Sequence, residues 1–288
     1  MMLNQIKKSL YSFLPKKIRK KIKNFYYDSI IPFYNLRNKI RYGFGDFFDH
    51  IALETTTYCN LRCNLCPNSK YERGLLKNQK LMDDKLFKKI INELSEFNYR
   101  GQLLFHFYGE PLTDKRLPEF VSYARKRLPK ADLQINTNGF LLTIPLYEKL
   151  VASGVDSFFI TQYFKEIPPN IKKLLIYLRN KPKKHNKIKY RVLGSELSLS
   201  NRGGEIKVDN PVDSERPICA YPKNILNIDY FGNVILCCND YHSSIIFGNL
   251  KREKLLNIWN KSDYRKFRKE LKKRIFKLSI CRRCVGIE

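Results

Sequence analysis

Between residues 50 and 193 the chain alternates short apolar segments with amphipathic ones. Strands are expected at 50–57, 102–107, 131–136, 155–160 and 187–193, and helices at 83–97, 116–128, 145–153 and 168–180. Strands separated by helices form parallel sheets with right-handed crossovers. In barrels of this kind the chemistry lies at the carboxyl ends of the strands. The alternation therefore predicts an α/β fold with a functional site at one edge of the sheet.

The pattern changes near residue 200, where Gly, Asn, Asp, Ser and Pro cluster. A β-hairpin is expected from 224–230 and 234–237. Helical segments follow at 253–259 and 262–275. These changes predict three parts, which are a basic extension at 1–48, a partial barrel at 49–205 and a small C-terminal domain at 206–288.

The formal net charge of +28 is concentrated at the two ends of the chain. Residues 1–50 hold 11 basic and 3 acidic side chains, and residues 251–288 hold 14 and 4. Because positive charge attracts anions, we expect a small-molecule substrate that is anionic or sugar-like. The chain has no zinc-finger or RNP signature, so no specific nucleic-acid function is expected.

Residues 1–26 form a basic amphipathic stretch. Apolar residues recur at helical spacing on both sides of Pro15, and six basic residues lie between Lys16 and Lys23. Such a stretch either packs on the protein or contacts an anionic membrane surface, and both readings stay open. No run of 18 uncharged apolar residues occurs, and no secretory signal is expected. We expect a cytoplasmic protein, with peripheral membrane contact as the alternative.

Three cysteines, Cys59, Cys63 and Cys66, stand in the loop after the first expected strand. A loop this short can bring three thiolates to one metal centre. A structural zinc ion normally takes four protein ligands, whereas three thiolates on a four-iron cluster leave one iron open to a small molecule. The spacing therefore favours an iron–sulfur cluster, and a zinc site completed by a distant residue stays the alternative.

A second group of four cysteines lies in the C-terminal part, at Cys219, Cys237, Cys281 and Cys284. Four thiolates close a metal site completely, and their spacing suits a zinc ribbon as well as an iron–sulfur cluster. Cys238 follows one of them directly. Its side chain is expected on the opposite face of the strand, as a small buried hydrophobic group.

The motif Cys59-x3-Cys63-x2-Cys66 resembles the signature of the radical S-adenosylmethionine (radical SAM) enzymes. Two further segments resemble that family at the ends of the second and third strands. Tyr108-Gly109-Glu110-Pro111 is similar to its Gly-Gly-Glu-like motif, which holds the methionine amino group, although Tyr replaces the first Gly. Asn136-Thr137-Asn138-Gly139 is similar to the turn near the adenosyl ribose.

The resemblance implies a fold and a cofactor. The fold is a partial (β/α)6 barrel, and the cofactors are S-adenosylmethionine and a [4Fe-4S] cluster on the first three cysteines. Leu65 matches the hydrophobic residue that rests against the adenine. The residues implied to bind S-adenosylmethionine are Leu65, Tyr108, Gly109, Glu110, Asn136 and Asn138.

The stretch from Gly248-Asn249-Leu250 to Ile258-Trp259-Asn260 resembles SPASM and twitch extensions of radical SAM enzymes. Four cysteines match the shorter, single-cluster twitch type, as in the aminocyclitol dehydrogenase subgroup. The resemblance implies a second, auxiliary [4Fe-4S] cluster on these cysteines, within a β-hairpin plus helix domain. A similarly placed arginine lies in the active site of that subgroup, which implies a catalytic role for Arg202.

The reaction implied by the resemblance is reductive cleavage of S-adenosylmethionine to a 5′-deoxyadenosyl radical. We expect this radical to start oxidation of a sugar or cyclitol alcohol, with the auxiliary cluster as electron acceptor. A flavodoxin- or ferredoxin-type protein is the expected electron donor. Two alternatives stay open, a radical SAM maturase that modifies peptides and a zinc-stabilised basic protein that binds nucleic acid or membranes.

Overall fold

The structure is a computed structural model that describes residues 15, 18, 32–193, 200–208, 219 and 221–288. The two helices expected on either side of Pro15 lie almost wholly outside the described residues. Residues 32–42 form a helix that the sequence patterns did not predict. Among the helices of the described residues, none is long and apolar enough to cross a membrane.

One sheet of eight strands runs through the described residues, in the order β5-β4-β3-β2-β1-β6-β7-β8. The strands are β1 (His50–Leu53), β2 (Gln102–Phe105), β3 (Asp132–Thr137), β4 (Ser157–Gln162), β5 (Ile188–Val192), β6 (Ile225–Ile228), β7 (Asn233–Ile235) and β8 (Ile246–Asn249). Strands β1 to β5 pair in parallel, and β6, β7 and β8 pair antiparallel to one another.

Strand β6 joins the two halves of the sheet. It pairs in parallel with β1, with His50 opposite Ile225 and Leu53 opposite Ile228. The expected α/β fold with a parallel sheet is confirmed, but its sixth parallel strand comes from the C-terminal part and lies beside β1, not beyond β5. Because β6 continues the same sheet, the boundaries at 48/49 and 205/206 stay predictions.

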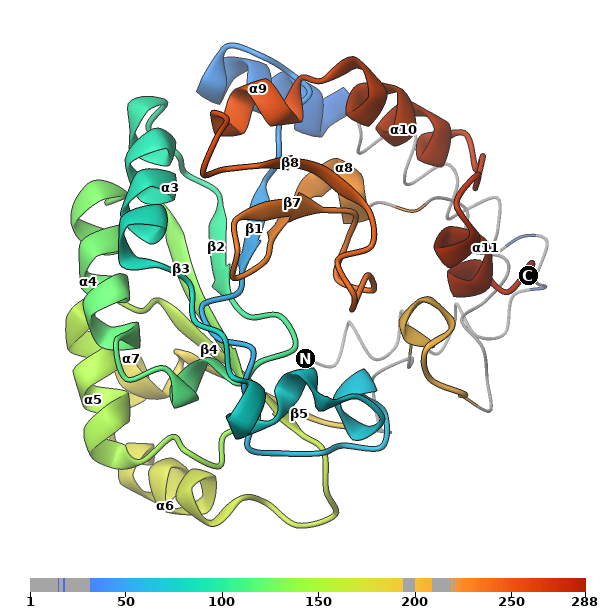
Figure 1. Ribbon diagram of the computed structural model, residues 1–288. Coiled ribbons are helices and arrows are strands. Elements are labelled where there is room, and N and C mark those ends of the chain that lie inside the picture. The colour runs from blue at the N-terminus through green and yellow to red at the C-terminus, as the bar shows by residue number, and fades with distance from the viewer. Residues whose placement is uncertain (1–14, 16–17, 19–31, 194–199, 209–218, 220) are drawn as a thin grey trace.

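Helices cover the outer face of the curved parallel sheet, where α3, α4, α5 and α6 follow one another (Figure 1). They are α3 (Asp84–Glu96), α4 (Leu117–Arg127), α5 (Ile144–Ser153) and α6 (Pro169–Leu178), with the short α7 (Pro182–His185) before β5. The expected start of α3 is confirmed, because the Asp83 side chain accepts a hydrogen bond from the backbone N–H of Leu86. Its apolar face, including Phe87, Ile90 and Leu94, is fully buried against the sheet.

The C-terminal helices are α8 (Tyr221–Asn224), α9 (Leu255–Trp259), α10 (Ser262–Lys272) and α11 (Ser279–Val285). The patterns predicted α9 and α10 but neither α11 nor β8. The C-terminal part docks on α3, because the buried Glu93 carboxylate accepts a hydrogen bond from the backbone N–H of Leu255 over 2.7 Å. That contact satisfies one of the free N–H groups at the start of α9.

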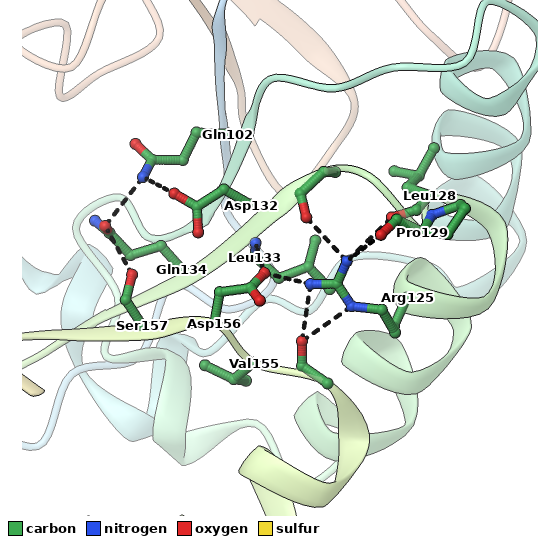
Figure 2. A network of polar contacts seen from close by, with 12 residues as sticks. Gln102, Arg125, Leu128, Pro129, Asp132, Leu133, Gln134, Val155, Asp156 and Ser157 are labelled. Carbon is green, nitrogen blue, oxygen red and sulfur yellow. Dashed lines mark hydrogen bonds and ion pairs between the residues drawn. The ribbon is translucent and has the colours of Figure 1, made fainter. Parts of the chain in front are cut away.

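A hydrogen-bonded network lines the amino ends of β2, β3 and β4 (Figure 2). The Gln102 amide donates to Asp132 and to Gln134, and Gln134 also accepts from the Ser157 hydroxyl. Arg125 of α4 donates to Asp156 and to backbone oxygens beside it. These contacts satisfy buried polar groups at the edge opposite the expected site, so we assign them to stability.

Trp259 anchors the C-terminal helices to the segment before β1. Its indole is fully buried, packs edge-on against Phe48 and Tyr264, and donates from Nε1 to the backbone oxygen of Asp46 over 2.9 Å. The Arg268 guanidinium lies over the ring, 3.7 Å from its centroid. The large apolar ring and its hydrogen bond are both lost if the side chain is truncated.

We expect Trp259→Ala to lower the free energy of unfolding by about 3–5 kcal/mol, because a buried aromatic leaves a cavity. The exposed Ile176 on α6 is the control, and Ile176→Ala should change the free energy of unfolding by less than about 0.5 kcal/mol. Anaerobic urea unfolding followed by circular dichroism measures both. Equal midpoints for the two variants would contradict the anchoring role.

Candidate active site

The loop after β1 carries Cys59, Cys63 and Cys66, and short helical turns at Pro67–Ser69, Glu72–Gly74 and Leu76–Asn78 fold it back. All three thiols are half-buried and unpaired. Burial raises the pKa of Cys59 to about 12 and of Cys63 to about 11, and the charge of Cys66 adds to the rise at both thiols. Among the described residues no three Cys, His, Asp or Glu side chains are arranged closely enough to hold a metal ion, so a shared cluster on these thiols stays a prediction.

This donor set fits an iron–sulfur cluster. The backbone N–H groups of Leu61 and Asn68 act against the rise in pKa at Cys59 and Cys66, which favours thiolates. Thiolates are the ligands of such clusters, and hydrogen bonds to the sulfurs tune their potential. With three cysteines from one loop, one iron would stay free for a small molecule.

A buried ion pair holds the cysteine loop against the sheet. Glu54, at the carboxyl end of β1, accepts a hydrogen bond from Arg73 over 2.6 Å and another from the backbone N–H of Tyr230. Burial raises the pKa of Glu54 to about 7, although Arg73 opposes the rise. The Arg73 guanidinium also lies within 6 Å of the ring centroids of Phe107, Tyr230 and Tyr241. One loop residue thus contacts the ends of β1, β2 and β6.

Gly109 allows the turn after β2 to lie directly on the turn after β1. A Cβ added at this position would lie 1.9 Å from the backbone oxygen of Thr56, so only glycine fits. Glu110, which is 4% exposed, accepts hydrogen bonds from Thr137 Oγ1 over 2.6 Å and from the backbone N–H of Asn138 over 2.9 Å. Burial raises its pKa to about 7. In the structure Glu110 holds the end of β3 beside the end of β2.

The predicted residues of β3 lie at the same edge. Asn138 donates from Nδ2 to Oδ1 of Asn60 in the cysteine loop over 2.9 Å, and the half-buried Asn136 accepts from Gln134 over 2.7 Å. Leu65 is half-buried in the cysteine loop. The ends of β2 and β3 and the cysteine loop therefore meet where S-adenosylmethionine is expected, and the role of each residue stays a prediction.

Arg202 reaches the same edge from the C-terminal side. Tyr108, Cys238, Tyr163 and Cys66 lie within its electrostatic reach. Burial opposes its charge, but these groups raise the pKa of Arg202 above its usual value. Its Nε and the Tyr108 hydroxyl are buried without a hydrogen-bond partner among the described residues. Unpaired buried polar groups of this kind are suited to a polar ligand.

Two residues at the ends of β2 and β4 complete the surroundings of Arg202. His106 follows β2, and burial followed by the Arg202 charge lowers its pKa to about 4, so its imidazole is neutral at pH 7. Tyr163 follows β4, and burial raises its pKa to about 12. Cys238 is half-buried within the electrostatic reach of Arg202 and Tyr108, so it faces this site and is not a fully buried hydrophobic group.

The auxiliary cysteines act on one another electrostatically, although those described do not form a ready metal site, and their ligand role stays a prediction. The charge of Cys219 acts on both Cys237 and Cys281, and that of Cys284 acts on the same two thiols. Asn239 donates hydrogen bonds to the Sγ atoms of Cys237 and Cys284 over 3.4 and 3.3 Å. Four thiols with N–H donors to sulfur fit a second iron–sulfur cluster.

Two family models match the chain. The model of the Radical SAM superfamily matches residues 53–162, which include the first three cysteines. The model of SPASM, an iron–sulfur cluster-binding domain, matches residues 219–285, which include the other four. Together with the relative described next, these matches show that the chain belongs to the radical SAM superfamily and carries a SPASM region.

Particular members of the superfamily are similar over most of the chain. The S-adenosyl-L-methionine-dependent 2-deoxy-scyllo-inosamine dehydrogenase of Niallia circulans is 30% identical over 251 residues, 83% of this chain and 94% of that protein. The crystal structure of BtrN in complex with AdoMet and 2-DOIA matches with a TM-score of 0.73 and 31% identity, over 82% of this chain and 92% of that one.

A shorter match is the tungsten-containing aldehyde ferredoxin oxidoreductase cofactor-modifying protein of Pyrococcus furiosus. It is 35% identical over 107 residues, which are 37% of this chain and 28% of that protein. The matches confirm the predicted enzyme class, a radical SAM oxidoreductase, and its cofactors, which are S-adenosylmethionine, the radical SAM [4Fe-4S] cluster and auxiliary iron–sulfur. They favour iron–sulfur over the zinc-stabilised alternative.

Sequence reasoning missed several residues of this edge. Glu54 carried a signal, because a carboxylate at the end of a buried strand needs a partner. The sequence carries no such signal for Arg73, Tyr163 or Asn239, since each acts through contacts between segments far apart in the chain. Only the folded structure shows those contacts.

The intact, anaerobically reconstituted chain should hold about eight irons, two four-iron clusters. Cys281→Ala/Cys284→Ala should hold about four and still form 5′-deoxyadenosine with dithionite. Cys59→Ala/Cys63→Ala/Cys66→Ala should also hold about four but form none. Iron assays measure the iron per chain, and chromatography measures 5′-deoxyadenosine. Equal amounts of 5′-deoxyadenosine from the two variants would refute the assignment of the first three cysteines to the radical SAM cluster.

Gly109→Ala should weaken S-adenosylmethionine binding by at least about tenfold, because the added Cβ forces the turns after β1 and β2 apart. Equilibrium dialysis of the reconstituted protein measures the dissociation constant. Gly43→Ala is the control, since its φ of +85° would strain an alanine but the added Cβ would meet nothing within 4 Å. If both variants bind equally well, Gly109 has no special place at the site.

Proposed function

We propose that the protein oxidises a secondary alcohol of a cyclitol or sugar to a ketone. The observation that carries the proposal is the half-buried Arg202, whose buried Nε has no partner among the described residues and which lies within electrostatic reach of Cys66 and Cys238. The relative of Niallia circulans, which acts on an aminocyclitol alcohol by its name, supports the substrate class.

When bound, the cofactors supply a 5′-deoxyadenosyl radical that takes the carbinol hydrogen atom and an auxiliary cluster that takes the remaining electron. The hydroxyl proton leaves to a base, so the substrate loses two hydrogens in all. The residues of this chain position the alcohol between these two centres and keep water away from the carbon radical.

Arg202 is the group best suited to bind the reacting hydroxyl. Its guanidinium carries a permanent positive charge, which stabilises the oxygen as the proton leaves. The neutral imidazole of His106, near Arg202, supplies an acceptor for a hydroxyl hydrogen. Together they offer one donor and one acceptor to an alcohol, whereas a purely anionic ligand would need donors alone.

The remaining partners stay predictions of this proposal. A flavodoxin- or ferredoxin-type protein supplies the electron for cleavage of S-adenosylmethionine. The cytoplasmic location rests on the chemistry of reduced thiols. Peripheral membrane contact through residues 1–26 concerns residues that lie almost entirely outside those described.

The direct test is incubation of the reconstituted protein with dithionite, S-adenosylmethionine and 2-deoxy-scyllo-inosamine. A product with two hydrogens fewer, in a one-to-one ratio with 5′-deoxyadenosine, supports the proposal. If 5′-deoxyadenosine forms without any oxidised product from cyclitols or sugars, the substrate class is wrong. Modification of a peptide in the same assay would favour the maturase alternative.

Arg202→Lys should lower kcat/KM for the alcohol by about 10- to 100-fold, because a point charge replaces a planar group with several donors. The slow formation of 5′-deoxyadenosine without substrate should stay within twofold or so of the wild-type rate. The exposed Arg179 gives the matched control, Arg179→Lys, which should leave kcat/KM unchanged. Equal kcat/KM in both variants would remove Arg202 from the site.

A further inference from the structure

Asn239 contacts two of the four auxiliary cysteines. Its backbone N–H donates to Sγ of Cys237 over 3.4 Å, and its side-chain Nδ2 donates to Sγ of Cys284 over 3.3 Å. The residue is 4% exposed, so water does not compete for these bonds. Neither the family motifs nor the predicted ligand set includes it.

The other side of the same amide faces the loop that carries Arg202. Asn239 Oδ1 accepts a hydrogen bond from Ser200 Oγ over 3.1 Å, and Ser200 Oγ accepts one from the backbone N–H of Arg202 over 3.1 Å. If the Asn239 amide were flipped, its oxygen would face the Cys284 sulfur, and the N–H donor that a thiolate needs would be lost. The amide orientation that donates to the sulfur is therefore also the one that accepts a hydrogen bond from Ser200.

Arg202 needs such support because its backbone is in the left-handed region, with φ 53°, which is unfavourable for a residue with a side chain. Two further bonds fasten the loop to α11, from Asn201 Nδ2 to the backbone oxygen of Arg283 and from Arg283 Nε to that of Gly203. Since α11 carries Cys281 and Cys284, the loop rests on the auxiliary ligands from two directions.

We propose that Asn239 is a positioning residue that couples the auxiliary cluster to Arg202. A bound cluster fixes the Cys284 sulfur, the sulfur fixes the amide, and the amide fixes Ser200 and the backbone of Arg202. The same N–H groups stabilise the added electron of a reduced cluster, because hydrogen bonds to the sulfurs raise its potential. Only the final link, from Arg202 to the alcohol, rests on the proposed function.

The test uses the full chain with Cys59→Ala/Cys63→Ala/Cys66→Ala, so that the auxiliary cluster alone is present. Asn239→Leu removes the side-chain bond to sulfur and the bond to Ser200, whereas Ser200→Ala removes only the link to Arg202. Asn257→Leu, at an exposed position on α9, is the matched control. Redox titration followed by electron paramagnetic resonance gives the cluster potential, and hydrogen exchange reports the opening of residues 200–206.

Asn239→Leu should lower the cluster potential and speed exchange of residues 200–206 by about fivefold, the effect of one lost hydrogen bond. Ser200→Ala should speed exchange equally and leave the potential unchanged. A lowered potential with unchanged exchange in Asn239→Leu would overturn the coupling, as would exchange in Ser200→Ala equal to that of Asn257→Leu.

Ser200→Ala keeps the proposal testable if Asn239→Leu does not fold, because it removes only one hydroxyl. Neither measurement uses the alcohol substrate. If the cyclitol assay fails while both readouts change as expected, the proposed function is wrong and the coupling holds. If the cyclitol assay succeeds and neither the potential nor the exchange changes, the proposed function holds and the coupling through Asn239 is wrong.

Discussion

The parallel pairing of β1 with both β2 and β6 determines the rest of the arrangement. Because the strands run in the same direction, their carboxyl ends meet at one edge, and the loop with Cys59, Cys63 and Cys66 follows β1 at this edge. Glu54 and Arg73 hold the edge together across the three strands. Segments that are more than 170 residues apart in the chain, those of Glu54 and Tyr230, are thereby held side by side.

The sequence patterns predicted the elements with regular periodicity. Helix α3 and strands β2 to β5 lie within two residues or so of the expected bounds, because apolar repeats report burial directly. Strand β8 has only four residues and contains Gly248, and α11 carries cysteines where apolar residues would show a helix. Neither gives a periodic signal. The parallel partner of β6 was not predictable either, since pairing between distant strands leaves no local pattern.

The site shows the same division between local and distant information. The first cysteine motif, Gly109 and Glu110 were singled out because they resemble short contiguous motifs, although the contacts of Gly109 and Glu110 are with the distant Thr56 and Thr137. Asn239 and Tyr163 were not found, because their roles come from partners 35 or more residues away. Cys238 was expected on a strand but lies in the turn after β7, and its environment depends on Arg202, which arrives from a different loop.

The shared sheet also limits how such a protein can be rebuilt by recombination. Removing the segment from β6 onward would expose the backbone N–H and C=O groups of β1 and uncover Ile51 and Leu53, which are fully buried. A transplanted C-terminal segment from another enzyme would have to restore the register of His50 with Ile225 as well as bind its own cluster. The parallel barrel strands and the C-terminal region thus fold as one unit through the pairing of β1 with β6. Substitutions at this pairing in one region are expected to require matching substitutions in the other.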